Sequence, residues 1–242
     1  MECKRLLSHA LNLWREQGND FRVAQTLGKL ADANRGMGLY EEGIQQAEEA
    51  SETFKRIGSV VEQASSLIDL AWLLCDANQL YAAEKAGSRA IALLPERGEE
   101  LWVCEAHHAL GNIYRTKGET TRAIYHLEIA LGIASSLNTV EEQFWVNFTL
   151  ADAFSEERKF GDAQTHVEHA KSLAVNNTYL LARASLLQAR VWFAQDMLGE
   201  AKSEALSALD VFEKLGAGSN SEFVRWFLEK IDARRPGQPD HS

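Results

Sequence analysis

The side chains best suited to chemistry in this sequence are five histidines in two short stretches: His107, His108 and His126 in one, His166 and His169 in the other. On a helix, residues three apart share a face, as His166 and His169 would, whereas neighbours such as His107 and His108 point about 100° apart. The spacing HVEH differs from the HExxH of zinc proteases, and no cysteine or acidic partner set completes a zinc site. We therefore expect solvent-facing or partly packed histidines and no metal site.

Motifs that carry catalysis are missing from the sequence. It contains no GxSxG nucleophile motif, no cysteine–histidine signature and no GxxxxGK[ST] phosphate loop. Acidic pairs such as Glu41-Glu42 and Glu156-Glu157 recur at expected helix starts and exposed faces, and a helix start favours negative charge. General acid–base catalysis needs carboxylates that converge in an apolar pocket, and no pattern predicts one. We expect no enzyme and no cofactor.

The bulk composition predicts an acidic, helical protein. Of 242 residues, 45% are hydrophobic, three are proline, and 35 acidic against 25 basic side chains give a net charge of −10. Few prolines and many Ala, Leu and Glu residues favour helices, and the negative charge opposes binding to nucleic acid or membrane surfaces. The three cysteines lack CxxC spacing, and no signal peptide or membrane-spanning apolar run occurs. We therefore expect a cytoplasmic protein with reduced thiols.

Apolar and small residues recur at intervals of 40 residues. One column consists of Leu30, Leu70, Leu110 and Leu150, each followed by a small residue. Two more columns are small throughout: Gly43, Ala83, Ala123 and Ala163, then Ala10, Ala50, Ala90, Ala130 and Ala170. A fifth, shorter unit has Ala189, Ala201 and Ala208 at these places. Each unit reads as two antiparallel helices.

Small side chains at these columns predict close helix packing, because helices approach to about 8–9 Å only where the contacting residues are small. Gly111 in a first helix is expected to face Ala123 in the second, and Ala130 to receive the next unit. In the third unit we expect helices over residues 99–117 and 120–137. Gly118 can supply the positive φ that ends the first of them, as can Asn78 one unit earlier.

The combination Leu110-Gly111, Tyr114, Gly118, Ala123, Leu127 and Ala130 resembles the tetratricopeptide repeat (TPR) family over roughly residues 1–215. The long repeats are similar in particular to those in the sensor arrays of NACHT and NB-ARC-type signalling NTPases. The period exceeds the family's usual value of about 34 residues, so the helices should be about a turn longer. The resemblance implies an all-α, right-handed superhelical solenoid of about five helix-turn-helix repeats.

We predict one domain over residues 1–235. It comprises an N-terminal half repeat at about 1–19, units at about 20–58, 60–97, 98–137, 138–176 and 178–216, and a capping helix at 219–235. The cap is expected because Phe223, Trp226, Phe227 and Ile231 fall on one helix face. Residues 236–242 should be a disordered tail. The half repeat suggests a chain that was cut from, or once belonged to, a longer protein, with an open apolar face.

The resemblance also implies a concave groove lined by the first helix of each unit. Carried over by position, its main residues are Asp32, Arg35, Ile68, Trp72, Asp76, His108, Asn112, Arg115, Phe148, Asp152, Arg183, Arg190 and Phe193. The same transfer also gives Gln25, Cys75, Glu105, Trp145, Glu156 and Leu186. We expect Trp72, Phe148 and Phe193 to anchor a ligand, because aromatic side chains often dominate interface energies. In the alternative interpretation, the longer helices rotate some of these aromatics into the core.

These patterns predict a protein–protein interaction module that binds a peptide or helix in its groove. We expect it to be a sensor or scaffold segment of a larger signalling protein. The alternative is a structural array that self-associates through the half repeat, or inhibits its own parent protein, without a separate partner. An enzyme or small-molecule receptor would need an apolar pocket that the sequence does not reveal.

Overall fold

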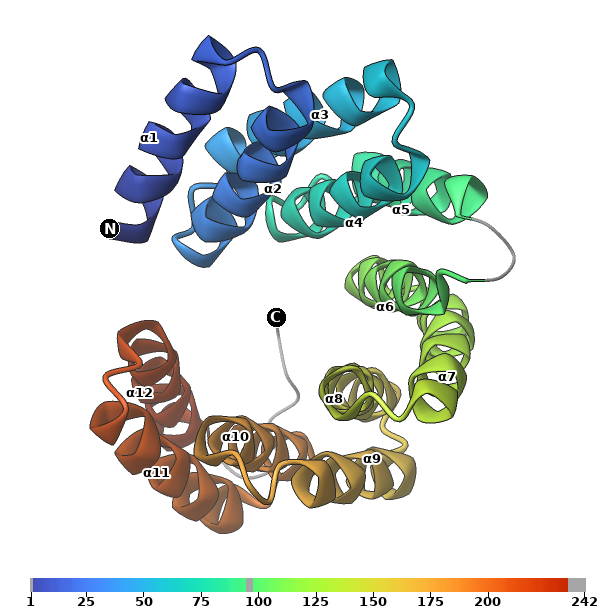
Figure 1. The fold of residues 1–242 in the computed structure, drawn as a ribbon. Helices are drawn as coiled ribbons and strands as arrows, with labels where there is room; N and C mark the ends of the chain where they lie inside the picture. Colours follow the sequence, from blue (N-terminus) through green and yellow to red (C-terminus); the bar gives the residue numbers. More distant parts are fainter. Residues whose placement is uncertain (1, 95–97, 235–242) are drawn as a thin grey trace. The chain divides into compact units, whose positions relative to one another are not determined.

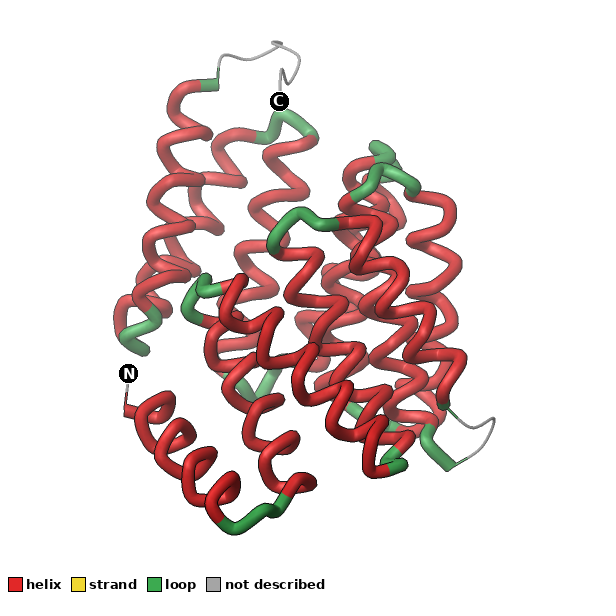
Figure 2. Tube along the Cα trace, turned by 90° about the horizontal axis from the view of Figure 1, so that it is seen from above, coloured by secondary structure: helices red, strands yellow, loops and turns green. Residues whose placement is uncertain are grey.

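The computed structural model describes residues 2–94 and 98–234, and these form twelve α-helices and no strand (Figures 1 and 2). The chain divides into two compact units between Leu137 and Asn138. The predicted all-α helical repeat fold is confirmed. The tail expected at residues 236–242 lies outside the described residues.

The first of these two compact units, which ends at Leu137, contains several repeats. It consists of a lone helix followed by three helical hairpins (Figure 1). Helix α1 spans Glu2–Glu16, and the hairpins are α2 (Asp20–Gly36) with α3 (Tyr40–Ile57), α4 (Val60–Asp76) with α5 (Leu80–Leu93), and α6 (Glu100–Thr116) with α7 (Thr120–Leu137). Helix α1 packs on α2, and the first helices of successive hairpins also contact one another, α2 with α4 and α4 with α6. These first helices therefore form a continuous layer.

The second unit contains two hairpins and a final helix. These are α8 (Val140–Glu156) with α9 (Phe160–Leu173), α10 (Thr178–Ala194) with α11 (Leu198–Lys214), and α12 (Gly218–Ala233). Helix α12 packs on α11 and buries Phe227 and Ile231, as expected of a cap. The expectation for Phe223 and Trp226 is wrong, because these side chains are 42% and 46% exposed. The buried stripe instead runs from Val224 through Phe227 to Ile231, at helical spacing.

The small residues of the 40-residue columns lie where helices meet. Ala50, Ala90, Ala130 and Ala170 are all 0% exposed. A Cβ atom on Gly111 would lie 3.3 Å from the carbonyl oxygen of Ala123, and one on Gly43 would lie 3.2 Å from that of Ala31. The predicted contact between Gly111 and Ala123 is therefore confirmed, whereas Ala10 on α1 is only partly buried.

The turn between α6 and α7 has the backbone conformation that the sequence predicts. Gly118 has φ 75°, and its counterpart Asn78 has φ 58°. The Glu119 amide donates to the Tyr114 carbonyl at 2.8 Å, which satisfies one of the last carbonyl groups of α6. A residue that tolerates positive φ thus lets the chain reverse directly into the next helix.

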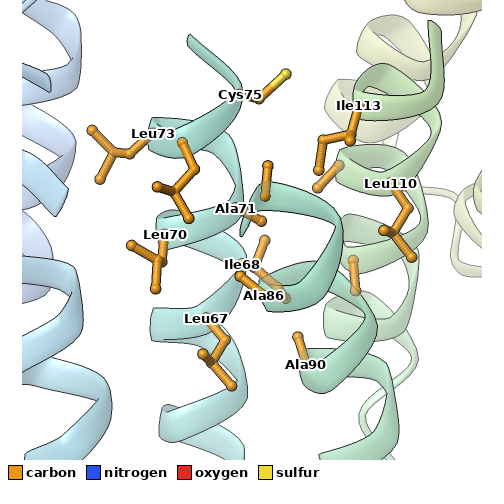
Figure 3. Close-up of a cluster of buried hydrophobic side chains, with 14 of the residues drawn as sticks. Leu67, Ile68, Leu70, Ala71, Leu73, Cys75, Ala86, Ala90, Leu110 and Ile113 are labelled. Atoms are coloured by element: carbon orange, nitrogen blue, oxygen red, sulfur yellow. The ribbon is translucent and has the colours of Figure 1, made fainter. Parts of the chain in front are cut away.

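The larger core cluster of the first unit is centred on α4, α5 and α6 (Figure 3). Leu67, Leu70 and Leu110 belong to the same core cluster as the small residues Ala71 and Ala90, so large side chains fill the space left around the close helix contacts. None of the helices in the described residues combines the length and the apolar character needed to cross a membrane.

Candidate protein-binding faces

In the first unit, four predicted groove residues on α2, α4 and α6 contact one another. The Arg35 guanidinium lies 4.9 Å from the ring centroid of Trp72, and its Nε donates to Asp76 Oδ2 at 2.6 Å. The Trp72 and His108 rings meet edge to face, with centroids 5.1 Å apart. We call Arg35, Trp72, Asp76 and His108 the Trp72 cluster. It orients a partly exposed tryptophan between a cation and an imidazole.

Burial decides the charge of the cluster's histidine. Desolvation, with a smaller effect from the positive charge of Arg35, lowers the pKa of His108 to about 4. His108 is therefore neutral near pH 7 and presents an aromatic surface instead of a second cation. The positive charge that faces Trp72 comes from Arg35.

Three other predicted residues of the first unit are polar and continue the layer of first helices. Asp32 is exposed on α2, and on α6 the Nη2 of Arg115 donates to Asn112 Oδ1 at 3.0 Å. Asn112 Nδ2 in turn lies 3.6 Å from the sulfur of Cys75 on α4. Asn112 thus connects α6 to α4 on this face.

Ile68 does not belong to the predicted groove. Its side chain is 1% exposed and lies in the core of α4, α5 and α6 (Figure 3). Ala64, Ala71 and Cys75, which lie four residues before it and three and seven after it, are buried as well. Ile68 therefore shares the inward stripe of α4, as the alternative interpretation of longer helices allows.

In the second unit, the predicted residues come from α8 and α10. The Arg183 guanidinium lies 5.0 Å from the Phe148 ring centroid and 5.1 Å from that of Trp145. Arg183 Nε is buried without a hydrogen-bond partner in the structure described, and burial lowers the pKa of this guanidinium. Phe148 is only 8% exposed, so its ring contacts Arg183 and leaves little surface for a partner.

The remaining predicted residues of this unit are held by neighbouring helices. Arg190 Nη2 lies 3.0 Å from Asp152 Oδ1, an ion pair between α10 and α8 in which Asp152 is nearly buried. Phe193 packs edge to face on Phe227 of α12 at 5.4 Å, and the Arg234 guanidinium lies 4.4 Å from its ring. Phe193 is thus partly buried against the capping helix.

Solved structures share this arrangement of helices. No protein-family model and no curated protein sequence matches the chain. A Rap protein complexed with competence and sporulation factor aligns at TM-score 0.72 and 14% identity, over 95% of this chain and 69% of that one. A thermophilic TPR protein of Thermus thermophilus aligns at 0.66 and 16%, over 86% and 98%. The fold is that of TPR-like repeats.

A STAND protein with a tetratricopeptide repeat sensor, from Pyrococcus horikoshii, has the same TPR-like fold. It aligns at TM-score 0.69 and 17% identity, over 96% of this chain but 37% of that protein. Identities at this level show the common fold alone. These structural matches agree with the TPR resemblance that was inferred from the 40-residue repeats.

One cavity among the TPR-like hairpins of the first unit was missed by the sequence analysis. It measures about 510 Å³, and the carboxyl groups of Asp32, Glu62, Asp69 and Glu105 line it. Of these, Asp32 and Glu105 are at positions that the resemblance assigns to the groove, whereas Glu62 and Asp69 are not. The sequence does contain a signal that could have revealed Asp69, because this residue is the one charged side chain within the apolar stretch LIDLAWLLC on α4.

The histidines of the TPR-like hairpins pack against neighbours, as expected. The Nδ1 atoms of His107 and His126 lie 2.9 Å apart, so one ring donates to the other, and His166 Nδ1 lies 2.8 Å from Asn147 Oδ1. Within residues 2–94 and 98–234, no three His, Cys, Asp or Glu side chains come together in a group that could hold a metal ion. His107, His126 and His166 thus pack against neighbouring polar side chains.

Proposed function

We propose that the chain is a protein-interaction module of TPR-like repeats that binds a peptide or helix from another protein on its first helices. The Trp72 cluster carries the proposal. Interface hot spots are enriched in tryptophan and arginine, and ordering such side chains before binding reduces the entropy lost on association. Arg35 and His108 hold Trp72 in this way while leaving part of it exposed.

Two of the similar structures support a role as a sensor or scaffold segment of a larger signalling protein. The Rap protein was solved with a bound competence and sporulation factor, and the Pyrococcus horikoshii protein carries its repeats as a sensor. The charged groups that flank Trp72 and line the first helices suit a partner segment with both apolar and polar side chains.

Capture of partners by the immobilised chain, quantified by mass spectrometry, tests the proposal. Trp72→Ala should reduce recovery of a specific partner at least fivefold, because interface tryptophans often contribute about 2 kcal/mol or more. Tyr81→Ala is the matched control, since Tyr81 on α5 is 83% exposed and lies outside the Trp72 cluster. Equal recovery by the two variants, both folded by circular dichroism, would show that Trp72 does not anchor the partner.

A second candidate function is self-association through α1. Leu6 and Leu13 on this helix are 59% and 42% exposed, which gives α1 apolar surface that a second copy could cover. Light scattering of the chain should then show a dimer that Leu6→Glu with Leu13→Glu dissociates. A monomer at high protein concentration would exclude this candidate.

A further inference from the structure

The acidic cavity of the first unit is formed by three successive first helices. Asp32 comes from α2, Glu62 and Asp69 from α4, and Trp102 and Glu105 from α6. Gly28 on α2 also lines the cavity, and a Cβ atom there would lie at an ordinary contact distance of 3.9 Å from Asp69 Oδ2. At about 510 Å³, the cavity has room for a long side chain.

The ionisable side chains that line this cavity are mostly acidic. Four carboxyl groups line it, against one lysine, Lys29. Asp69 is partly buried, and in the part of the chain that the structure describes no hydrogen bond or ion pair satisfies its carboxyl group. Desolvation disfavours the ionised form of this carboxyl group, so a cation that entered the cavity would stabilise its negative charge.

The geometry favours an organic cation over a metal ion. The described residues contain no group of three carboxylate, histidine or cysteine side chains close enough to hold a metal. The lining is also partly apolar, with the Trp102 indole and Val61 beside the carboxyl groups. Lysine and arginine match this mixture, since each has an apolar stem and a cationic head that is attracted to an indole ring.

We propose that this cavity receives a lysine or arginine side chain of the partner polypeptide, with the Asp69 carboxylate facing its charge. The inference rests on the proposed function and specifies the partner chemically, as a segment with a basic residue for the α2–α4–α6 face. The Trp72 cluster contributes the aromatic contact, and the cavity contributes selection for positive charge.

Binding should depend on pH around neutrality. Burial, followed by the nearby Asp32 charge and opposed by Arg35, raises the pKa of Asp69 to about 7. The other ionisable groups of the lining are Lys29 and Asp32 from α2, Glu62 from α4 and Glu105 from α6. The cation-binding, ionised form of Asp69 increases about tenfold from pH 6 to pH 8, and affinity should follow it.

The experiment uses the full chain and single-residue probes. N-acetyl-lysine methylamide and N-acetyl-arginine methylamide supply the side chains, and N-acetyl-norleucine methylamide is the uncharged control. Binding is followed by NMR at the indole N–H of Trp102, which Trp102→Phe assigns. At pH 8 the lysine and arginine probes should shift this resonance saturably, and the norleucine probe should not. Their affinity should fall roughly tenfold at pH 6.

Two variants separate the cavity from the overall negative charge. Asp69→Asn should weaken lysine binding at least fivefold and abolish its pH dependence between 6 and 8. Glu128→Gln changes the net charge equally at an exposed site on α7 and should leave binding unchanged. The proposal is overturned if norleucine binds as well as lysine, if the two variants behave alike, or if no probe shifts Trp102. Partner capture that still depends on Trp72 would then preserve the proposed function without the cation pocket.

Discussion

A Cβ atom on Gly111 would lie 2.5 Å from Cγ of Leu127, closer than side-chain carbons approach one another. Gly111 belongs to α6 and Leu127 to α7, and both are buried. The missing side chain is therefore what allows the branched carbon of Leu127 to rest on the α6 backbone. The columns of small residues that recur in the sequence correspond to contacts of this kind.

Gly111→Ala should lower the free energy of unfolding by about 1–3 kcal/mol, because an added methyl group forces Leu127 or the helix to move. Urea denaturation measures the change. Gly132→Ala is the matched control, since Gly132 is also helical but, among the described residues, its Cβ would meet no atom of a neighbouring segment within 4 Å. That variant should gain up to about 1 kcal/mol from helix propensity. Destabilisation of equal size at both sites would contradict the packing argument.

Asp69→Asn should stabilise the protein above neutral pH. Because the folded-state pKa of Asp69, about 7, exceeds the usual aspartate value of 3.8, wild-type stability is lost as pH rises between these values. At pH 8 we expect the variant to be more stable by on the order of 1–3 kcal/mol, with little difference at pH 4.

Thermal and urea unfolding at both pH values test this prediction, and Glu128→Gln serves as the exposed control. An Asp69→Asn variant that is less stable than wild type at pH 8 would show that the carboxylate has a compensating partner.

His107 should stay neutral well below its usual range. Burial, with a smaller effect from His126, lowers its pKa to about 4. The packing of neutral His107 therefore contributes stability above the unfolded-state pKa of about 6.5, and this contribution is lost as pH falls toward 4. His107→Gln should flatten the decline in unfolding free energy between pH 6.5 and 4.5. An NMR titration of His107 with a midpoint at or above 6.5 would refute the assignment.

Arg183 and Arg190, both on α10, should respond differently to replacement by methionine. Arg183→Met removes a largely buried guanidinium whose Nε lacks a hydrogen-bond partner among the described residues, so stability should change by less than about 1 kcal/mol or increase. Arg190→Met leaves the nearly buried Asp152 without its ion pair and should cost about 2–4 kcal/mol.

Urea denaturation of the two variants provides the comparison. A larger loss for Arg183→Met than for Arg190→Met would mean that Arg183 has a structural role that its contacts with Phe148 and Trp145 do not reveal.

The repeat architecture could be predicted because the constraint behind it is local in sequence. A residue at a close helix contact must be small, and a residue at a tight turn must tolerate positive φ, so Ala123 and Gly118 reveal their places by type alone. The helix predicted over residues 120–137 matches α7, which spans Thr120–Leu137.

The groove was harder to predict because it depends on helix rotation. A shift of one residue turns a side chain by about 100°, which is enough to move Ile68 from a surface to the core. Asp69, its neighbour, lines the cavity, although the position-by-position transfer did not include it. A carboxylate within an apolar helix is visible in the sequence, but its neighbours on α2 and α6 become known only when the hairpins stack.

The regular spacing of Ala50, Ala90 and Ala130 also bears on how such a chain can change in length. Each alanine presents a similar small contact, and Leu70, Leu110 and Leu150 follow at the same interval. An in-frame duplication or loss of forty codons would therefore bring together surfaces already suited to one another. Genetic recombination could lengthen or shorten the array while each surviving junction keeps its chemistry.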